Sequence, residues 1–417
     1  MKILLMAYEC SPYRGSEWAV GWGRLLQAAR VAEVHVVTSE ENFKALQQAT
    51  REGFLPANVR LHTPPPDDRL RRKDPHAGMF AYDYAAYHHW QRLAQKLIVQ
   101  LHWEQRFDIV HQVTVNTFRE PGYGWKLDAP FLWGPVGGSQ NFPRSFLSML
   151  PWKEAAKEFL RGVVNEWTLR RNRRVLAAAH GAKVVLASNS TNQRDYERAW
   201  HRPVELLLET GLTAVQEPDR ARFAQRVAGE ARPLELLWSG ELQTRKALPI
   251  LLRALAKTNM PFRLTVLGDG PMRSLWEAEA QKLKLEDRVF FRGRLPFAEA
   301  VAAMQQADVF CFTSLRDTSG NVVLEALAAG VPVVCFDHQG VGDIVTQACG
   351  IKIAVSNPRE AVEAWRDALE RLYQQPEVML AMSFAATERA RDFLWKRNGD
   401  YVNALYRQLS QRENMGA

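Results

Sequence analysis

The sequence predicts an α/β protein built from two doubly wound, Rossmann-like domains that face each other across a cleft. Three observations support this fold class. At 417 residues, the chain is longer than one hydrophobic core usually organises. Short apolar runs alternate with helical patterns at regular intervals, as the βα repeats of a parallel sheet require. Several of these runs end in glycine-rich or small polar loops, which in such sheets lie at the carboxyl edge where ligands bind.

The composition is that of a globular protein that works in the cytoplasm. Hydrophobic residues make up 47% of the chain and charged residues 24%. No apolar run reaches the roughly 18 residues that a membrane span needs, and residues 1–7 read as a first strand. The net charge of +8 suits an anionic ligand, an anionic lipid surface or nucleic acid. Four cysteines lack metal-ligand spacing and are expected as buried free thiols: Cys10, Cys311, Cys335 and Cys349.

The elements of the first domain follow from the positions of the apolar runs. A helix at 18–30 follows a small-residue loop that contains Gly15 and Ser16, and its free N–H groups favour an anion. A proline-rich loop is expected at 64–75 and a polar interdomain linker at 213–233. Strands are predicted at residues 2–7, 34–38, 59–63, 107–112, 130–139, 183–188 and 204–208.

Two long helices are predicted in this first half. The aromatic helix at 79–105 is expected to pack into the core, with a wall for an acceptor as the alternative. Its adjacent His88 and His89 point about 100° apart and cannot chelate one ion. The helix at 152–179 carries a basic run beside Val163, Val164 and Trp167, which fits either an anionic membrane or a solvated face. That run is Arg170, Arg171, Arg173 and Arg174.

The second domain repeats the strand–helix pattern, and its central unit spans residues 309–336. A short apolar strand leads into a polar loop, an alanine-rich helix ended by Gly330, and a further buried strand. The amino end of that helix is an anion site because its first N–H groups are unpaired. Asp317 lies in the loop and Glu325 in the helix; the simpler alternative is a solvated acid and a helix-dipole partner. Strands are predicted at 234–239, 263–267, 289–291, 309–312, 332–336 and 351–354.

This stretch resembles the acidic signature of the retaining glycosyltransferases of the GT-B fold, family 4 (group 1). The family writes an acid, seven residues and Glu, then Ala-Met/Leu-Ala-x-Gly-x-Pro-Val-Val; here Glu325 begins Glu-Ala-Leu-Ala-Ala-Gly-Val-Pro-Val-Val. Asp317 departs from the usual first Glu by one methylene. The resemblance implies that Glu325 binds the ribose of a nucleotide sugar and that Asp317 binds the sugar hydroxyls. The diphosphate would rest on the backbone of Ser319, Gly320, Asn321 and Val322.

Other landmarks of the family lie at neighbouring strand ends. Gly240 to Lys246 is similar to the motif Gly-Arg-Leu-x-x-x-Lys-Gly, whose lysine contacts the donor diphosphate, although Glu241 and Ala247 replace its Arg and second Gly. Arg245 adds a second cation, which suits the charge that grows on a leaving diphosphate. The resemblance also assigns donor contacts to Gly15, Ser16, Gly240, Gly268, Asp269 and Gly293.

The first domain matches the family less closely. His111 ends the strand at 107–112 and either faces the acceptor or is a hydrogen-bonded structural histidine. Gly137 and Gly138 stand where many relatives carry a sugar-binding histidine. The resemblance implies domains at 1–208 and 213–390, with a last helix at about 393–417 that packs back on the first domain.

The resemblance implies a retaining transfer from a nucleotide-diphosphate sugar to a sugar or lipid-linked sugar acceptor, in surface polysaccharide or glycolipid assembly. We expect no metal and no cofactor, a cytoplasmic location with an anionic membrane surface as a further partner, and no nucleic acid, because no aromatic-basic pattern supports one. Two alternatives stay open. One is an epimerase or hydrolase of nucleotide sugars with the same fold, and the other is a non-catalytic binding module.

Overall fold

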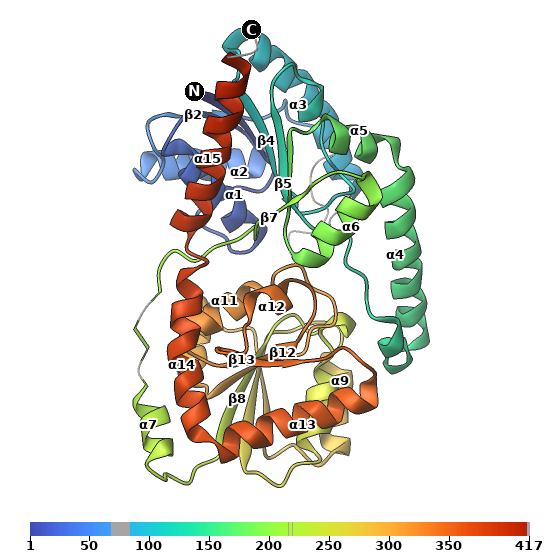
Figure 1. The fold of residues 1–417 in the computed structure, drawn as a ribbon, viewed down its shortest axis with the longest axis vertical. Helices are drawn as coiled ribbons and strands as arrows, with labels where there is room; N and C mark the ends of the chain where they lie inside the picture. The colour runs from blue at the N-terminus through green and yellow to red at the C-terminus, as the bar shows by residue number, and fades with distance from the viewer. Residues whose placement is uncertain (68–83, 216, 219, 415–417) are drawn as a thin grey trace. The chain divides into compact units, whose positions relative to one another are not determined.

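The computed structural model describes residues 1–67, 84–215, 217–218 and 220–414. The chain forms two compact units (Figure 1). The first unit comprises Met1–Ser139, Glu166–Gly211 and Trp395–Ala417, and the second comprises Gln140–Asn165 and Leu212–Leu394. Residues 140–165 thus group with the second unit, whereas we expected all of 1–208 in the first domain. Phe146 explains this grouping, since its ring packs edge-on against Phe336 of the second unit at 5.9 Å.

The first unit is built on a seven-stranded parallel sheet with the order β3-β2-β1-β4-β5-β6-β7. This order, reversing next to β1, is that of a dinucleotide-binding fold. The strands are β1 Lys2–Ala7, β2 Glu33–Val37, β3 Val59–His62, β4 Ile109–Thr114, β5 Phe131–Val136, β6 Val184–Ala187 and β7 Glu205–Leu206. The helices with residues in this unit are α1 Glu17–Ala29, α2 Glu40–Arg51, α3 Tyr84–Gln105, the end of α4 Trp152–Arg171, α5 Arg173–Gly181, α6 Ser190–Trp200 and α15 Trp395–Asn414.

The last helix, α15, packs closely against α1 within the first unit. A side chain at Gly23 of α1 would overlap the ring of Trp395, so the two helices approach closely only because Gly23 has none. The buried Arg24 donates to Asn398 of α15, and Asn398 in turn donates to the carbonyl of Leu208 at 2.7 Å. The end of the chain therefore belongs to the core of the unit in which the chain begins.

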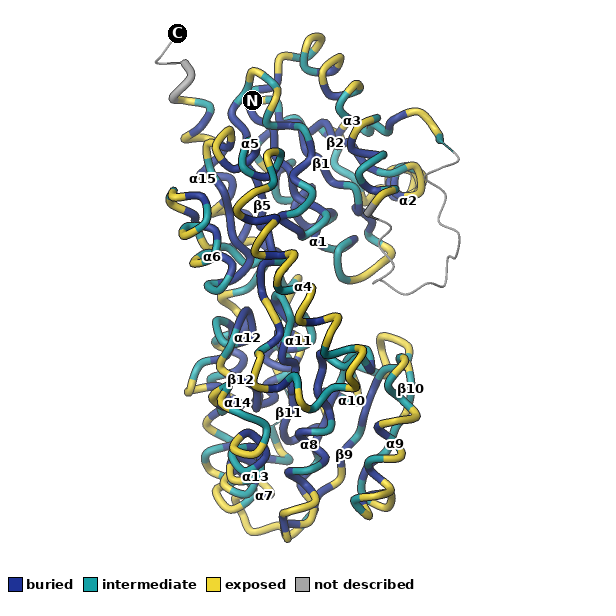
Figure 2. Tube along the Cα trace, turned by 90° about the vertical axis from the view of Figure 1, so that its right-hand side faces the viewer, coloured by how far each residue is buried: buried dark blue, intermediate teal, exposed yellow. Residues whose placement is uncertain are grey.

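The second unit holds a six-stranded parallel sheet with the order β10-β9-β8-β11-β12-β13. Figure 2 shows β11 buried in dark blue and the outer helices marked with exposed yellow. The strands are β8 Leu234–Ser239, β9 Phe262–Leu267, β10 Val289–Gly293, β11 Val309–Phe312, β12 Val333–Phe336 and β13 Gly350–Ile353. The helices with residues in this unit are the first part of α4, α7 Ala221–Val227, α8 Leu248–Leu255, α9 Arg273–Lys282, α10 Phe297–Gln306, α11 Asn321–Ala328, α12 Gln339–Ile344, α13 Pro358–Gln374 and α14 Pro376–Arg391.

Two predictions of local structure were wrong. The single helix expected at 152–179 is broken at Asn172, whose side chain accepts hydrogen bonds from the N–H groups of Arg174 and Val175 and so starts α5 as a cap. The linker expected at 213–233 contains the short helix α7, in which Phe223 is buried. The side-chain cap at Asn172 thus divides the expected helix in two, and the burial of Phe223 stabilises a helix in the polar linker.

The aromatic helix follows the core interpretation. Tyr87 and Trp90 of α3 are buried in the first unit, while Trp103 is exposed. His88 contacts Glu120 at 3.2 Å and His89 contacts Asp67 at 2.8 Å, so the two histidines serve different partners. Residues 79–83, and residues 68–75 of the expected proline-rich loop, lie outside the described residues.

Candidate active site

Three neighbouring strands of the second unit end in glycines that pack backbone on backbone. The N–H of Gly240 donates to the carbonyl of Leu267 at 3.0 Å, and the N–H of Gly268 donates to that of Gly293 at 2.8 Å. Gly268 has φ +117°, and a side chain there would overlap the carbonyl oxygen of Gly240. At the ends of β8, β9 and β10, the glycines therefore place no side chain over the backbone of the carboxyl edge. This edge is where parallel sheets bind ligands.

Asp269 stabilises the tight loop that follows. Its carboxylate accepts the N–H of Gly270 at 2.8 Å, and its backbone carbonyl accepts the N–H of Leu242 at 3.0 Å. Its other carboxylate oxygen lies 3.6 Å from the guanidinium of Arg273. Asp269 thus shapes the edge beside Gly268.

A buried cluster of opposite charges lies at the same edge of the sheet. Lys246, in a short 3-10 turn after β8, donates its ammonium to Oδ2 of Asp317 in the loop after β11. A guanidinium nitrogen of Arg245 lies 3.5 Å from the same oxygen. The hydroxyl of Ser314 also donates to Oδ2, at 3.3 Å, and the N–H of Thr318 donates to Oδ1 at 3.2 Å. Both oxygens of the Asp317 carboxylate are therefore engaged.

Burial and charge act in opposite directions in this cluster. Burial alone would raise the pKa of Asp317, but the charges of Lys246 and Arg245 outweigh it and hold that pKa well below its usual range. The pKa of Lys246 is lowered by burial, which the attraction of Asp317 opposes and the repulsion of Arg245 reinforces. Burial also lowers the pKa of Arg245. The cluster brings together two cations and one anion at positions that the sequence analysis singled out separately.

The amino end of α11 stands at the end of the Asp317 loop. Gly320 precedes the helix with φ +77°, and no side chain caps the first turn. The hydroxyl of Ser319 donates to the side-chain oxygen of Asn321 at 3.3 Å. Because no side chain caps the helix, the N–H groups of Asn321 and Val322 remain donors for an anion, whereas the N–H of Val323 donates to the carbonyl of Gly320 at 2.8 Å. Val322, in the first turn, is half-buried.

Glu325 lies on α11 and reaches the surface of the second unit rather than its packed interior. The protein around it displaces enough water to raise the pKa of its carboxyl to about 7. At neutral pH this residue therefore stands near the midpoint between the acid and the carboxylate.

The structure adds residues that the sequence analysis did not name. Gln339, at the start of α12, accepts the N–H of Asp317 through its side-chain oxygen at 2.8 Å and donates to the carbonyl of Asn141 at 3.1 Å. A side chain at Gly340 would overlap the carbonyl of Thr318. The sequence could have indicated these two residues, because they follow the strand β12 and therefore lie at the same carboxyl edge of the sheet.

The site residues expected in the first unit have different surroundings. Gly15 is exposed in open space, and Ser16 has φ +58° before α1 with no capping bond from its side chain. The carbonyl of Gly137 accepts the hydroxyl of Tyr196 at 2.7 Å, and Gly138 has φ +99° beside Thr117. The positive φ of Gly138 is a structural reason for glycine in the loop after β5, whereas the bond to the Gly137 carbonyl involves only its backbone.

In this structure His111 has no exposed surface with which to contact a sugar acceptor. The residue is fully buried, with Nδ1 2.6 Å from the hydroxyl of Tyr406 and Nε2 2.7 Å from the carbonyl of Gly134. Burial lowers the pKa of His111 to about 3. The structural alternative for this histidine is the correct one, because its two ring nitrogens join α15 to β5.

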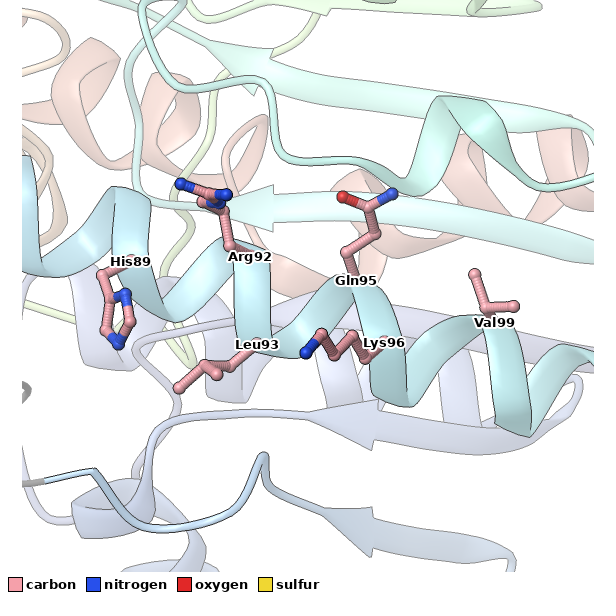
Figure 3. A pocket seen from close by; sticks show the side chains of 6 residues that line it. All are labelled: His89, Arg92, Leu93, Gln95, Lys96 and Val99. Carbon is pink, nitrogen blue, oxygen red and sulfur yellow. The ribbon is translucent and has the colours of Figure 1, made fainter.

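Figure 3 shows a separate pocket of the first unit along α3, with a volume of about 670 Å³. The side chains of Arg92 and Gln95 point to one side of the helix, and those of His89 and Leu93 to the other. The lining residues are His89, Arg92, Leu93, Gln95, Lys96 and Val99. None of the predicted site residues lines this pocket. Among the described residues, no group of three or more His, Cys, Asp or Glu side chains is placed to hold a metal ion.

The architecture and the site define a GT-B glycosyltransferase fold. Anabaena HepE in complex with UDP superposes with a TM-score of 0.62 at 16% identity, covering 98% of this chain and 100% of that one. The lipopolysaccharide glycosyltransferase WaaG superposes with a TM-score of 0.59 at 19% identity, covering 97% and 99%.

Residues 219–389 match the family model described as "Glycosyl transferases group 1". A D-inositol 3-phosphate glycosyltransferase of Saccharomonospora viridis is 33% identical over 45% of this chain and 45% of its own length. The putative colanic acid biosynthesis glycosyltransferase WcaL of Salmonella typhimurium is 30% identical over 35% of this chain and 38% of its own. The matches thus span less than half the length of these curated relatives.

Proposed function

We propose that this protein is a retaining glycosyltransferase that moves a sugar from a nucleotide-diphosphate sugar to a sugar or lipid-linked sugar acceptor. One observation carries the proposal. Two buried cations, Lys246 and Arg245, lie at the carboxyl edge of the second sheet, and the amino end of α11 at this edge has no side-chain cap. Cations and free N–H groups together are what a diphosphate requires. The structures of HepE with UDP and with UDP-glucose support a donor of this class.

The donor would lie along the loops after β8 and β11. Its diphosphate would accept hydrogen bonds from the N–H groups of Ser319, Gly320, Asn321 and Val322 and face Lys246 and Arg245. Glu325, one turn along α11, would accept the ribose hydroxyls. Gly240, Gly268 and Gly293 have no side chain to keep the nucleotide from the backbone, and Asp269 supports that edge. Gly15 and Ser16 would add N–H groups from the first unit, with Gly137 and Gly138 on the acceptor side.

The chemistry needs stabilisation of the leaving group. The acceptor hydroxyl oxygen bonds to the anomeric carbon while the bond from that carbon to the diphosphate breaks, negative charge grows on the departing phosphate, and that phosphate oxygen takes the proton that the hydroxyl loses. Preorganised cations at that point lower the barrier more than they stabilise the bound donor. Lys246 and Arg245 are placed for this role, and we propose that neither a metal nor a cofactor takes part. Retention of configuration follows from the family resemblance.

The acceptor class is proposed from relatives whose names concern colanic acid and lipopolysaccharide biosynthesis. We place the reaction in surface polysaccharide or glycolipid assembly on the cytoplasmic side, against an anionic membrane, and without a role for nucleic acid. Among the described residues no helix is both long enough and apolar enough to cross a bilayer.

The test is a panel of nucleotide sugars offered with soluble and lipid-linked sugar acceptors, with products identified by mass spectrometry. Acceptor-dependent release of the nucleoside diphosphate and a glycosylated product are expected. Consumption of donor without acceptor would instead indicate the epimerase or hydrolase. Nucleotide binding without turnover on any acceptor would indicate a non-catalytic module. Thermal shift with nucleotides identifies the base first, since a ligand that binds the folded state raises its stability.

A further inference from the structure

The first part of helix α4 exposes its large apolar residues and buries polar ones, which is the reverse of an ordinary surface helix. Over residues 152–164, which belong to the second unit, its polar residue Glu158 is buried and its large apolar residues face outward. The exposed fractions are 76% for Trp152, 53% for Phe159, 61% for Leu160, 49% for Val163 and 44% for Val164. A surface helix normally buries such residues against the core, so this face is made for contact with something else.

Hydrogen bonds of its buried polar residues determine which face of α4 points outward. The carboxylate of Glu158 accepts two hydrogen bonds from the guanidinium of Arg316, at 2.7 and 3.0 Å. Asn165 donates to the side-chain oxygen of Asn141 at 2.8 Å. Arg316 directly precedes Asp317 in the candidate donor loop. The outward direction of the apolar face is therefore held by a buried ion pair and does not result from a loose helix.

The exposed residues form one stripe. At about 100° per residue, Trp152, Phe159 and Val163 fall within one narrow arc, and Glu158 lies about 100–140° around the helix from them. Leu160 and Val164 widen the stripe on one edge. We call these five residues the α4 stripe: Trp152, Phe159, Leu160, Val163 and Val164. Exposed apolar residues that cluster in this way mark an interaction surface, whereas single ones are ordinary.

Cations accompany the α4 stripe. The ammonium of Lys153 lies 5.6 Å from the ring centre of Trp152, and the guanidinium of Arg144 lies 5.9 Å from that of Phe159. Lys157 is exposed at the border of the stripe, 3.7 Å from Glu154. Aromatic residues flanked by basic ones suit the interface of an anionic bilayer.

Two arginines of the basic run from Arg170 to Arg174 are paired with carboxylates. Arg174 is paired with Glu120 in the first unit, and Arg170 is paired with Glu166 at 2.6 Å. Arg173 follows the break at Asn172, outside α4. The cations that border the apolar stripe lie instead at the other end of the helix, at Lys153 and Lys157.

We propose that the α4 stripe docks on an anionic lipid surface, with Lys153, Lys157 and Arg144 facing the headgroups. A second copy of the chain fits less well, because two copies of the same patch carry the same positive charge and repel each other. The proposal names the membrane partner of the proposed transferase. It does not depend on the donor chemistry, because lipid binding is measured without donor.

The test is cosedimentation of the whole protein with vesicles of phosphatidylglycerol and phosphatidylethanolamine, compared with phosphatidylcholine alone. Binding to the anionic vesicles is expected and should weaken as salt is raised. Phe159→Ser/Val163→Ser should reduce it by about tenfold or more, since two apolar contacts are lost. Lys153→Glu/Lys157→Glu should reduce it by at least about 25-fold, because each lysine near such a surface is worth about fivefold in affinity.

Matched controls come from exposed residues elsewhere in the second unit. Phe297→Ser on α10 and Lys282→Glu on α9 should leave vesicle binding unchanged. Wild-type protein that stays in the supernatant, or stripe variants that bind as well as the wild type, would overturn the proposal. So would a concentration-dependent dimer in light scattering that the stripe variants abolish, because it would assign the face to a second copy.

A thermal shift with the panel of nucleoside diphosphates, run on every variant, separates this proposal from the proposed function. Stripe variants that keep the nucleotide response but lose the vesicles support the membrane surface. A wild type that binds vesicles but no nucleotide contradicts the donor assignment alone. If Phe159→Ser/Val163→Ser does not fold, the two-lysine variant, whose changes lie on exposed side chains, decides the outcome.

Discussion

The ammonium of Lys246 and the carboxylate of Asp317, 71 residues apart in the chain, form an ion pair at the carboxyl edge of the second sheet. Only about 10% of the Lys246 side chain and 21% of the Asp317 side chain are exposed. An incoming diphosphate that uses this lysine must therefore compete with a carboxylate already bound to it. The family resemblance assigns Asp317 to sugar hydroxyls; the structure shows it as the counter-ion of the proposed catalytic cations.

Asp317→Asn should tighten the binding of UDP by about tenfold, because a neutral amide competes less for Lys246 and Arg245 than a carboxylate does. Uridine, which has no diphosphate, should bind equally to both proteins. Isothermal titration with the two ligands measures this difference. Asp317→Glu is the control, since it keeps the charge. Weaker UDP binding in Asp317→Asn would mean that Asp317 orders the cations for the phosphate and does not compete with it.

Lys246→Ala should lower the rate of transfer by about 10²–10³, the usual cost of one preorganised group that stabilises developing charge. Initial rates at saturating donor measure the effect on kcat, and Lys282→Ala, at the exposed end of α9, is the control. A mutant with wild-type kcat and a raised KM would show that Lys246 binds the donor uniformly and does not act in the transition state.

Glu325 predicts a pH dependence of nucleotide binding. Its pKa, raised to about 7 by loss of water, leaves the carboxylate ionised at pH 8 and protonated at pH 6. Only the ionised form accepts hydrogen bonds from both ribose hydroxyls with full strength. The affinity for UDP should therefore fall as the pH is lowered through 7. Glu325→Gln should bind more weakly at pH 8 and lose this pH dependence, and Glu325→Ala should abolish detectable transfer. An unchanged pH profile in Glu325→Gln would assign the titration to another group.

Glu158→Ala should destabilise the second unit by about 3 kcal/mol, because it leaves the Arg316 guanidinium buried without its partner. Thermal unfolding followed by circular dichroism measures the loss. Glu154→Ala is the matched control on the same helix, and it should cost no more than about 0.5 kcal/mol because its pair with Lys157 is solvated. Equal effects of the two substitutions would show that the Glu158–Arg316 pair does not anchor α4.

The sequence by itself determined the two parallel sheets and the loops at their carboxyl edges. The strands at 234–239 and 309–312 match β8 and β11, because a buried parallel strand is a short apolar run whatever surrounds it. Gly330 was readable as a helix boundary, since positive φ favours glycine. Glu325 and Lys246 were identified by motifs that need only local spacing.

Tertiary structure alone decided which of these residues meet. The pairing of Lys246 with Asp317, the support of the loop by Gln339 and the burial of His111 against Tyr406 all join residues that are distant in sequence. The direction of α4 was equally unreadable, because an amphipathic pattern names two faces without saying which one turns inward. The ion pair of Glu158 with Arg316 settles that direction, and it depends on a contact across 158 residues of chain.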